Sequence, residues 1–599
     1  MYRDIKLDLG SLRELYKSGA AAPSDVIAMI YDRMGTQPLG PVWINVVPRE
    51  KALSRARKLE RDPVGPVRPL YGVPFAVKDN IDLVGLPTTA ACPGYAYTPG
   101  RSASVVQALV DAGAIPVGKT NMDQFATGLV GTRSPHGAPS SVYDERYISG
   151  GSSSGSAVAV ASGLASFALG TDTAGSGRVP AAFNGLIGLK PTRGMLSTRG
   201  VVPACRSLDC ISIFSLTCDD AYTVWGAARG FDPDDGYSRV PRAGDEATPW
   251  LSGSFTFGVP PATQLEFFGD DAASALFEQA VERMEALGGR RLEIDYSVFQ
   301  AAAKLLYSGP WVAERYAAIR EFIESHAGEM NPVVRGIIEG ARRFSAADAY
   351  AAEYKLRDLR RATEVQWEGM DVMLLPTTGT IYTHEQVAAE PVAMNTNLGY
   401  YTNFVNLLDL AAVAVPAGRR ANGLPFGVSL IGPAFSDPAL LNLADRFHRA
   451  QGPVPGDVMD LSACPPGCIP VAVVGAHLTG QPLNHELTSR RAHLIRSCRT
   501  SPQYRLYALD GTMPPKPGLV RDPRYKGPGI EVEVWAVPEH QFGSFVAGVP
   551  APLGIGNAVL DDGSKVKSFI CEPFAVAGAT EITKFGGWRA YLGQALSTR

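Results

Sequence analysis

The chain has 599 residues, of which 45% are hydrophobic and 19% charged, and this length predicts two or three domains rather than a single core. Its formal net charge of −3 argues against nucleic acid or an anionic membrane as a partner. The first residues lack a signal-peptide pattern and no apolar run is long enough to span a membrane, so we expect a cytoplasmic protein.

The N-terminal part is predicted to be helical at first and then α/β. Apolar positions recur every three and four residues near the start, whereas from about Tyr71 short apolar runs alternate with helical stretches and Gly/Pro turns. That alternation is typical of an α/β sheet. The predicted helices are 11–20, 23–34, 48–62 and 102–113, and the predicted strands lie within 71–81 and 114–121.

The first candidate for chemistry is Lys78, which follows the apolar run GVPFAV. Burial at such a position would disfavour the charged amine, lower its pKa and let it accept a proton near pH 7. The alternative is a lysine at a strand end that points into solvent.

A segment rich in glycine and serine runs from Gly150 to Gly194. It lacks the GK[ST] ending of a phosphate loop and the GxGxxG spacing of a dinucleotide site, so the simplest interpretation is a glycine-rich turn before a buried helix at about 154–169. Ser176, however, lies between two glycines, where a cramped turn can present its hydroxyl. The neighbouring peptide N–H groups that can converge on one point, as an oxyanion hole requires, are those of Thr173, Ala174, Gly175 and Ser176.

A serine hydroxyl is a poor nucleophile until another group takes its proton. The histidines of the α/β part lie outside the glycine and serine motifs, and we expect His448 on the solvated side of an amphipathic helix. Lys78 is therefore the better candidate for the base. The histidines considered are His136, His326, His384 and His448.

The second half of the chain predicts one domain boundary. Residues 270–370 form a helical insert, after which strands return and complete a first domain of residues 1–455. The proline- and glycine-rich segment 456–469 is predicted to be a linker. Residues 470–599, with short strands between turns, are predicted to be a separate α+β domain.

The eight cysteines are scattered along the chain, which favours reduced thiols. Cys464 and Cys468 in the predicted linker have a spacing that suggests half of a zinc site. No second pair follows, so two idle thiols are the better interpretation.

The lysine and serine motifs together resemble those of the amidase signature family. The resemblance is carried by 150–194 and by PFAVKDN at 74–80, and NMDQFATG (121–128) and AVAVPAG (412–418) are similar to further family segments. It covers roughly residues 1–450. It implies an α/β amidase signature fold, in which helices cover a central mixed β-sheet.

Carried over by position, the resemblance implies a Ser–cis-Ser–Lys triad. Ser176 is then the nucleophile, Ser152 the bridging serine and Lys78 the base, and the Gly151–Ser152 peptide is expected to be cis. The resemblance implies neither a metal nor an organic cofactor.

Two positions depart from the family's GGSSGGS and TDTGGS patterns. Ser154 and Ala174 replace glycines. Both side chains are small, and we expect the turn to survive because Ser154 opens a helix and Ala174 contributes mainly its N–H.

The helical insert offers candidates for substrate recognition. Tyr307 and Arg315 lie eight positions apart (315 − 307 = 8), and the Gly309–Pro310 pair predicts a helix that starts there, with Tyr307 just before it. The alternative is a packed aromatic ring and a solvated arginine. The segment resembles the corresponding stretch of allophanate hydrolases within the amidase family, which implies that both side chains hold the carboxylate of a small substrate, allophanate.

Residues from about 470 resemble the gamma-glutamylcyclotransferase-like domain that follows the amidase part in allophanate hydrolases. The loop GAHLTGQPLN (475–484) carries the resemblance, and its His477 is a candidate acid or base for decarboxylating the first product. The alternative is that His477 only packs and that the domain stabilises a dimer. For the whole chain we expect a homodimer, with a urea carboxylase as a functional partner.

Two other functions stay open. The glutaminase subunit of a tRNA-dependent amidotransferase shares the signature, although it needs partner subunits and the extra C-terminal domain argues against it. A scaffold built on an inactive amidase fold is disfavoured by the joint presence of Lys78, Ser152 and Ser176.

Overall fold

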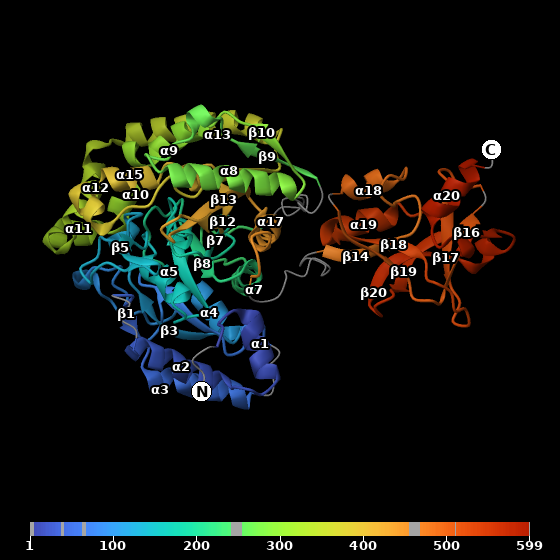
Figure 1. The fold of residues 1–599 in the computed structure, drawn as a ribbon, viewed down its shortest axis with the longest axis horizontal. Coiled ribbons are helices and arrows are strands. Elements are labelled where there is room, and N and C mark those ends of the chain that lie inside the picture. The colour runs from blue at the N-terminus through green and yellow to red at the C-terminus, as the bar shows by residue number, and fades with distance from the viewer. Residues whose placement is uncertain are drawn as a thin grey trace. The chain divides into compact units, whose positions relative to one another are not determined.

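A computed structural model gives the fold, and its described residues form two compact units, one up to residue 454 and one from residue 468 (Figure 1). Most of the predicted linker, including Cys464, lies outside the described residues. The residues that the structure describes are 5–36, 41–62, 68–240, 254–454, 468–490, 492–509 and 511–597.

The first unit is built around one mixed 11-stranded sheet. In sheet order its strands are β1 (Trp43–Val46), β3 (Ile115–Thr120), β2 (Pro74–Lys78), β6 (Phe167–Asp172), β8 (Cys210–Ser215), β7 (Ile187–Lys190), β12 (Leu410–Arg419), β13 (Pro425–Pro433), β11 (Val372–Pro376), β9 (Phe255–Val259) and β10 (Gly289–Glu293). β2 pairs in parallel with both β3 and β6, whereas β12 and β13 are antiparallel. The central strands β2, β6 and β8 are buried at every position, and β2 accordingly begins with the continuous apolar run PFAV.

Helices cover this sheet, as Figure 1 shows, which confirms the predicted α/β architecture. They are α1 (Leu9–Lys17), α2 (Pro23–Thr36), α3 (Arg49–Arg61), α4 (Ser104–Asp111), α5 (Ser154–Ala161), α6 (Val179–Phe183), α7 (Cys218–Ala228), α8 (Asp271–Ala286), α9 (Ser297–Ser308), α10 (Val312–Ala318), α11 (Arg320–His326), α12 (Pro332–Glu339), α13 (Ala346–Trp367), α14 (His384–Ala389), α15 (Ala393–Leu398), α16 (Phe404–Leu407) and α17 (Asp437–Arg449). β4 (Ser140–Ser141) and β5 (Asp144–Ile148) form a separate hairpin. No helix in the described stretches is both long and apolar enough to cross a membrane.

The predicted helix at 154–169 is wrong in its second half. α5 ends at Ala161, Gly163 takes a positive φ of 66°, and the chain enters β6 at Phe167. A left-handed glycine ends the helix, and the apolar residues beyond it pair into the sheet instead of continuing the helix. β1 is likewise a strand within a region predicted to be only helical.

The second unit is an α+β domain, as predicted. Its five-stranded sheet has the order β15 (His493–Arg499), β18 (Glu531–Pro538), β14 (Cys468–Val473), β20 (Lys565–Cys571) and β19 (Leu553–Val559). A three-stranded sheet contains β17 (Lys516–Arg521), β16 (Tyr504–Leu509) and β21 (Thr580–Glu581), and the helices are α18 (Asn484–Thr488), α19 (Glu539–Ala547) and α20 (Trp588–Ser597). α19 packs against β14 and β18. The likeness to gamma-glutamylcyclotransferase stays a prediction.

Candidate active site

Lys78 is the last residue of β2, and its side chain is fully buried. Its Nζ donates to Ser152 Oγ at 2.8 Å and to Thr171 Oγ1 at 2.7 Å. Burial lowers the pKa of Lys78 to about 7, although nearby carboxylates, chiefly that of Asp123, oppose the shift. The expectation of a buried amine with a lowered pKa is confirmed, whereas the contact with Thr171, the first residue of the TDTAGS segment, was not expected.

Ser152 and Ser176 lie in two loops, one before α5 and one after β6. The Gly151–Ser152 peptide is cis, as expected. Ser176 is 3% exposed, and its Oγ donates to the Gly128 carbonyl at 3.4 Å. Among the described residues no hydrogen bond joins the two serine hydroxyls, so proton transfer between them requires the Ser176 hydroxyl to turn away from Gly128.

The backbone around Ser176 is shaped by Asp172. Its Oδ1 accepts the Gly175 N–H at 2.8 Å and its Oδ2 accepts the Gly177 N–H at 3.0 Å. The Gly175 N–H, one of the oxyanion donors expected from the sequence, is therefore already engaged, and this corrects the expected set of donors. Within the described parts of the chain, the expected N–H groups that have no protein acceptor are those of Thr173, Ala174 and Ser176.

Asp172 is itself held by a buried arginine. Arg178 donates Nε and Nη2 to the two carboxylate oxygens at 2.9 and 3.0 Å, and both side chains are 0% exposed. Burial favours the neutral acid, yet the guanidinium outweighs it and keeps the pKa of Asp172 below its usual value. A Cβ at Gly175, where φ is +130°, would lie 2.5 Å from Thr402 Oγ1, so this position requires glycine. Ala174 has no positive φ, which explains why a methyl group is tolerated there.

Arg315 on α10 is 3% exposed, so the alternative of a solvated arginine is wrong. Its Nη1 donates to the Ala126 carbonyl at 3.2 Å and to Thr127 Oγ1 at 3.0 Å, and its Cζ lies 5.7 Å from the centroid of the Tyr307 ring. Tyr307 lies in the last turn of α9 rather than before a new helix. The Gly309–Pro310 pair ends α9 instead of starting α10, because Gly309 is the C-cap.

Asp209 contacts the oxyanion loop and lies close enough to Arg315 for its pKa to be affected by that charge, and sequence reasoning missed it. Its carboxylate accepts the Thr173 hydroxyl together with the N–H groups of Ala204 (2.8 Å) and Cys205 (3.2 Å). Burial raises the pKa of Asp209 to about 6, while these hydrogen bonds and the charge of Arg315 favour the carboxylate. No local pattern could reveal this link, because it joins segments that only the fold brings together.

The histidines of the first unit do not form this site. In the described residues none of them has a hydrogen bond to Ser152 or Ser176, and His384 contacts Ser140 Oγ at 3.0 Å. The expectation for His448 is wrong, since the ring is half-buried on α17 rather than solvated, and burial lowers its pKa to about 4.

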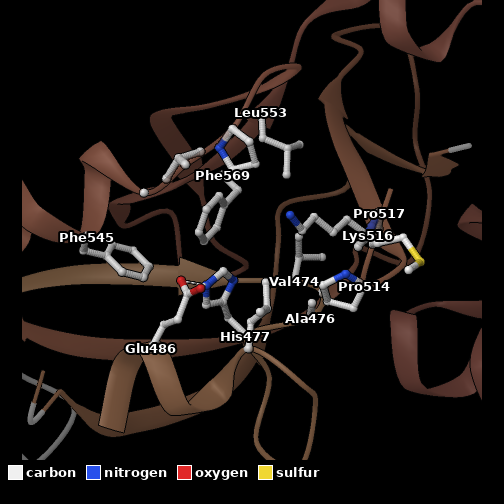
Figure 2. Close-up of a pocket in the computed structure, with 16 residues that line it drawn as sticks. Val474, Ala476, His477, Glu486, Pro514, Lys516, Pro517, Phe545, Leu553 and Phe569 are labelled. Atoms are coloured by element: carbon white, nitrogen blue, oxygen red, sulfur yellow. Dashed lines mark hydrogen bonds and ion pairs between the residues drawn. The ribbon is translucent and has the colours of Figure 1, made fainter. Parts of the chain in front are cut away.

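In the second unit, His477 lines a cavity of about 190 Å³ (Figure 2). Its Nε2 lies 3.0 Å from Glu486 Oε2, and its ring stacks on Phe569 with the centroids 4.9 Å apart. The Phe545 ring packs edge-on against the His477 ring. Burial lowers the pKa of His477, and the Glu486 carboxylate opposes that shift. His477 therefore packs against aromatic rings and also faces a cavity.

Two family models match the chain. The Amidase model matches residues 32–441, and the model described as Allophanate hydrolase C-terminal domain matches residues 469–593.

Curated relatives and a solved structure agree with both matches. The chain is 45% identical over 601 residues to urea amidolyase of Saccharomyces cerevisiae, which covers 96% of this chain and 32% of that protein. The chain thus spans about a third of the length of such relatives. It is 31% identical over 483 residues to a glutamyl-tRNA(Gln) amidotransferase subunit of Lawsonia intracellularis, over 76% of this chain and 99% of the relative. Its fold is similar to Kluyveromyces lactis allophanate hydrolase, with a TM-score of 0.82 and 43% identity over 99% of this chain and 100% of that one.

Proposed function

The chain is an amidohydrolase of the amidase family, and from this premise we propose that it hydrolyses allophanate (urea-1-carboxylate) and releases ammonia. The observation that carries the proposal is the buried guanidinium of Arg315, which lies close enough to Lys78 to contribute to its lowered pKa. A buried cation beside a serine–lysine network suits a small amide that carries a negative charge.

The proposed chemistry begins with the neutral amine of Lys78. It takes the proton of Ser152, Ser152 takes that of Ser176, and Ser176 Oγ attacks the amide carbon. The N–H groups of Thr173, Ala174 and Ser176 stabilise the oxyanion. The C–N bond then breaks, the proton returns by the same route to the departing ammonia, and water hydrolyses the acyl-enzyme to N-carboxycarbamate.

We assign the substrate carboxylate to Arg315, with Tyr307 beside it. Hydrogen bonds to Ala126 and Thr127 fix one guanidinium nitrogen, so the group is preorganised. A neutral or larger amide would leave this buried charge without a partner, which disfavours its binding.

The test is an assay of the purified chain for ammonia release from allophanate, glutamine, malonamate and biuret side by side. Allophanate should have by far the highest kcat/KM. A higher value for glutamine would overturn the proposal and favour the glutaminase component of an amidotransferase. A fluorophosphonate probe should label the native chain but not Ser176→Ala, which separates a wrong substrate from an inactive scaffold.

We also propose that the second unit decarboxylates N-carboxycarbamate with His477 as the proton donor, so that the product ends as ammonia and carbon dioxide. The support is the placement of His477 in a cavity, with its ring oriented by Glu486 and Phe569. His477→Asn should release the first ammonia from allophanate at the native rate, but carbon dioxide and the second ammonia with a lag. Unchanged carbon dioxide release would leave His477 with a packing role only.

For partners and location, we propose a homodimer in the cytoplasm whose substrate comes from a urea carboxylase. The support for the carboxylase is that the matched relatives are urea amidolyases, which are about three times as long as the region they share with this chain. Sedimentation analysis checks the dimer, and coupling of the purified chain to a urea carboxylase in urea-dependent ammonia release checks the supply.

A further inference from the structure

The His477 cavity also contains a cation, Lys516, at the start of β17. Its side chain is partly buried, and among the described residues its Nζ has neither a carboxylate nor another hydrogen-bond partner. Figure 2 shows the amine reaching into the same hollow as the His477 ring. Its charge is close enough to disfavour the imidazolium form of His477. An amine held in this way is suited to pair with an anion.

Two oppositely charged side chains line this cavity, Lys516 and Glu486, and they lie on opposite sides of the His477 ring. Figure 2 shows Lys516 on the side of the His477 ring that faces away from Glu486 and Phe545. The other walls are largely apolar, and they include Phe569 and Leu553. An anion on Lys516 therefore has the imidazole and an apolar wall within the same small space.

We propose that this cavity binds a small dicarboxylate, with one carboxylate on the Lys516 amine and the other against the apolar wall, and that Lys516 selects the ligand. The assignment rests on the decarboxylation proposed above. A charged carboxylate is poorly solvated beside aromatic rings, whereas neutral carbon dioxide is not, so this wall favours loss of the carboxylate that faces it.

The step balances without a co-reactant. In N-carboxycarbamate the bond between nitrogen and the carbon facing the apolar wall breaks, and its electron pair stays on nitrogen. Nitrogen takes one proton from His477, which gives −OOC–NH–COO− + H+ → −OOC–NH2 + CO2. The remaining carbamate keeps its charge on Lys516. The two negative charges of the ligand favour protonation of His477, so binding supplies the acid that the step needs.

The first test records ammonia and carbon dioxide in the same allophanate reaction of the full chain. Lys516→Met keeps the apolar stem and should leave release of the first ammonia unchanged, while it slows release of carbon dioxide and of the second ammonia about 10- to 100-fold, down to the rate of decarboxylation in solution. Lys516→Arg keeps the charge and should restore most of the rate. Lys526→Met, at an exposed position outside the cavity lining, is the matched control and should behave as the native chain.

The second test measures binding, so it does not depend on the rate of decarboxylation in solution. Malonate is the carbon analogue of N-carboxycarbamate, and in Ser176→Ala it should shift the NMR signal of the His477 ring. Adding Lys516→Met should weaken malonate binding about 10- to 100-fold, as read from that signal.

The outcomes separate the two proposals. If Lys516→Met binds malonate and releases carbon dioxide like the native chain while His477→Asn is slow, the assignment to Lys516 is overturned and the decarboxylation stands. If neither variant separates carbon dioxide release from release of the first ammonia, and malonate leaves the His477 signal unmoved, both proposals fail.

Discussion

Lys78 in the first unit and His477 in the second are both basic side chains with a pKa lowered by burial, but their partners differ. The Lys78 amine contacts two hydroxyl groups, whereas the His477 ring contacts a carboxylate. Hydroxyl groups do little to offset the cost of burying a charge, so the pKa of Lys78 falls to about 7 and its neutral form is populated near that pH. A carboxylate offsets part of that cost. Desolvation therefore favours a neutral proton acceptor in the first unit, whereas in the second unit the Glu486 carboxylate opposes the desolvation of the His477 ring.

The largest expected effect separates the two units in ammonia release. Ser176→Ala removes the proposed nucleophile and should lower kcat/KM for ammonia release by at least about 10⁴-fold. His477→Asn, the matched change in the other unit, should leave this value close to native. Initial rates with allophanate measure both, and a Ser176→Ala chain with native activity would place the nucleophile elsewhere.

The next effect concerns the stability of the two units. Arg178→Met leaves the Asp172 carboxylate buried without its cation, which should cost about 3–5 kcal/mol of unfolding free energy. Arg505→Met breaks the ion pairs with Asp522 and Glu581 at the surface of the second unit and should change stability far less. Urea denaturation of the three chains compares them, and equal losses would contradict the burial argument.

A smaller effect is expected on substrate affinity. Arg315→Lys keeps the charge but loses the planar pair of donors, so KM for allophanate should rise about 10- to 100-fold with a smaller change in kcat. Arg320→Lys, at an exposed position on α11, is the control. Steady-state kinetics decides, and a native KM in Arg315→Lys would remove the proposed carboxylate contact.

The pH dependence of the rate tests directly whether neutral Lys78 is the proton acceptor. Only neutral Lys78 accepts a proton, so kcat/KM for ammonia release should rise up to tenfold per pH unit below about 7 and level off above it. The sign for stability follows from the same shift. Between about pH 7 and 10.5 the unfolded chain keeps a proton on Lys78 that the folded chain has lost, so this residue makes the unfolding free energy increase with pH. A flat rate profile between pH 6 and 8 would contradict a neutral lysine base.

The smallest expected effect is on the pKa of His477, and it tests the role of the Glu486 carboxylate. Glu486→Gln removes the carboxylate that supports the charged ring, so the pKa of His477 should fall further while ammonia release stays native. An NMR titration of the His477 ring measures the shift. An unchanged pKa would mean that the Glu486 carboxylate does not support the charged form of His477.

Sequence alone was sufficient where the signal is local. The apolar run before Lys78 left a buried and a solvated amine open, and the resemblance to the amidase signature family favoured the buried one, which the structure shows. The glycines around Ser176 predicted a turn that presents its hydroxyl. Three- and four-residue periodicity predicted α1, α2 and α3 with small errors at their ends. Local signals failed at helix boundaries, as with α5 and with Tyr307 at the end of α9, because a glycine can end one helix or precede another.

Only the tertiary structure decided which groups meet. The residue motifs and their resemblance to the amidase signature family predicted the kind of chemistry, a serine hydrolase with a lysine base, because these motifs are local in the sequence. The contacts of Lys78 with Thr171, of Asp209 with Thr173 and the shared cavity of Lys516 and His477 join distant segments. Such contacts depend on strand order and register in the sheets, which are set by the summed packing of the whole unit and not by any one stretch of chain.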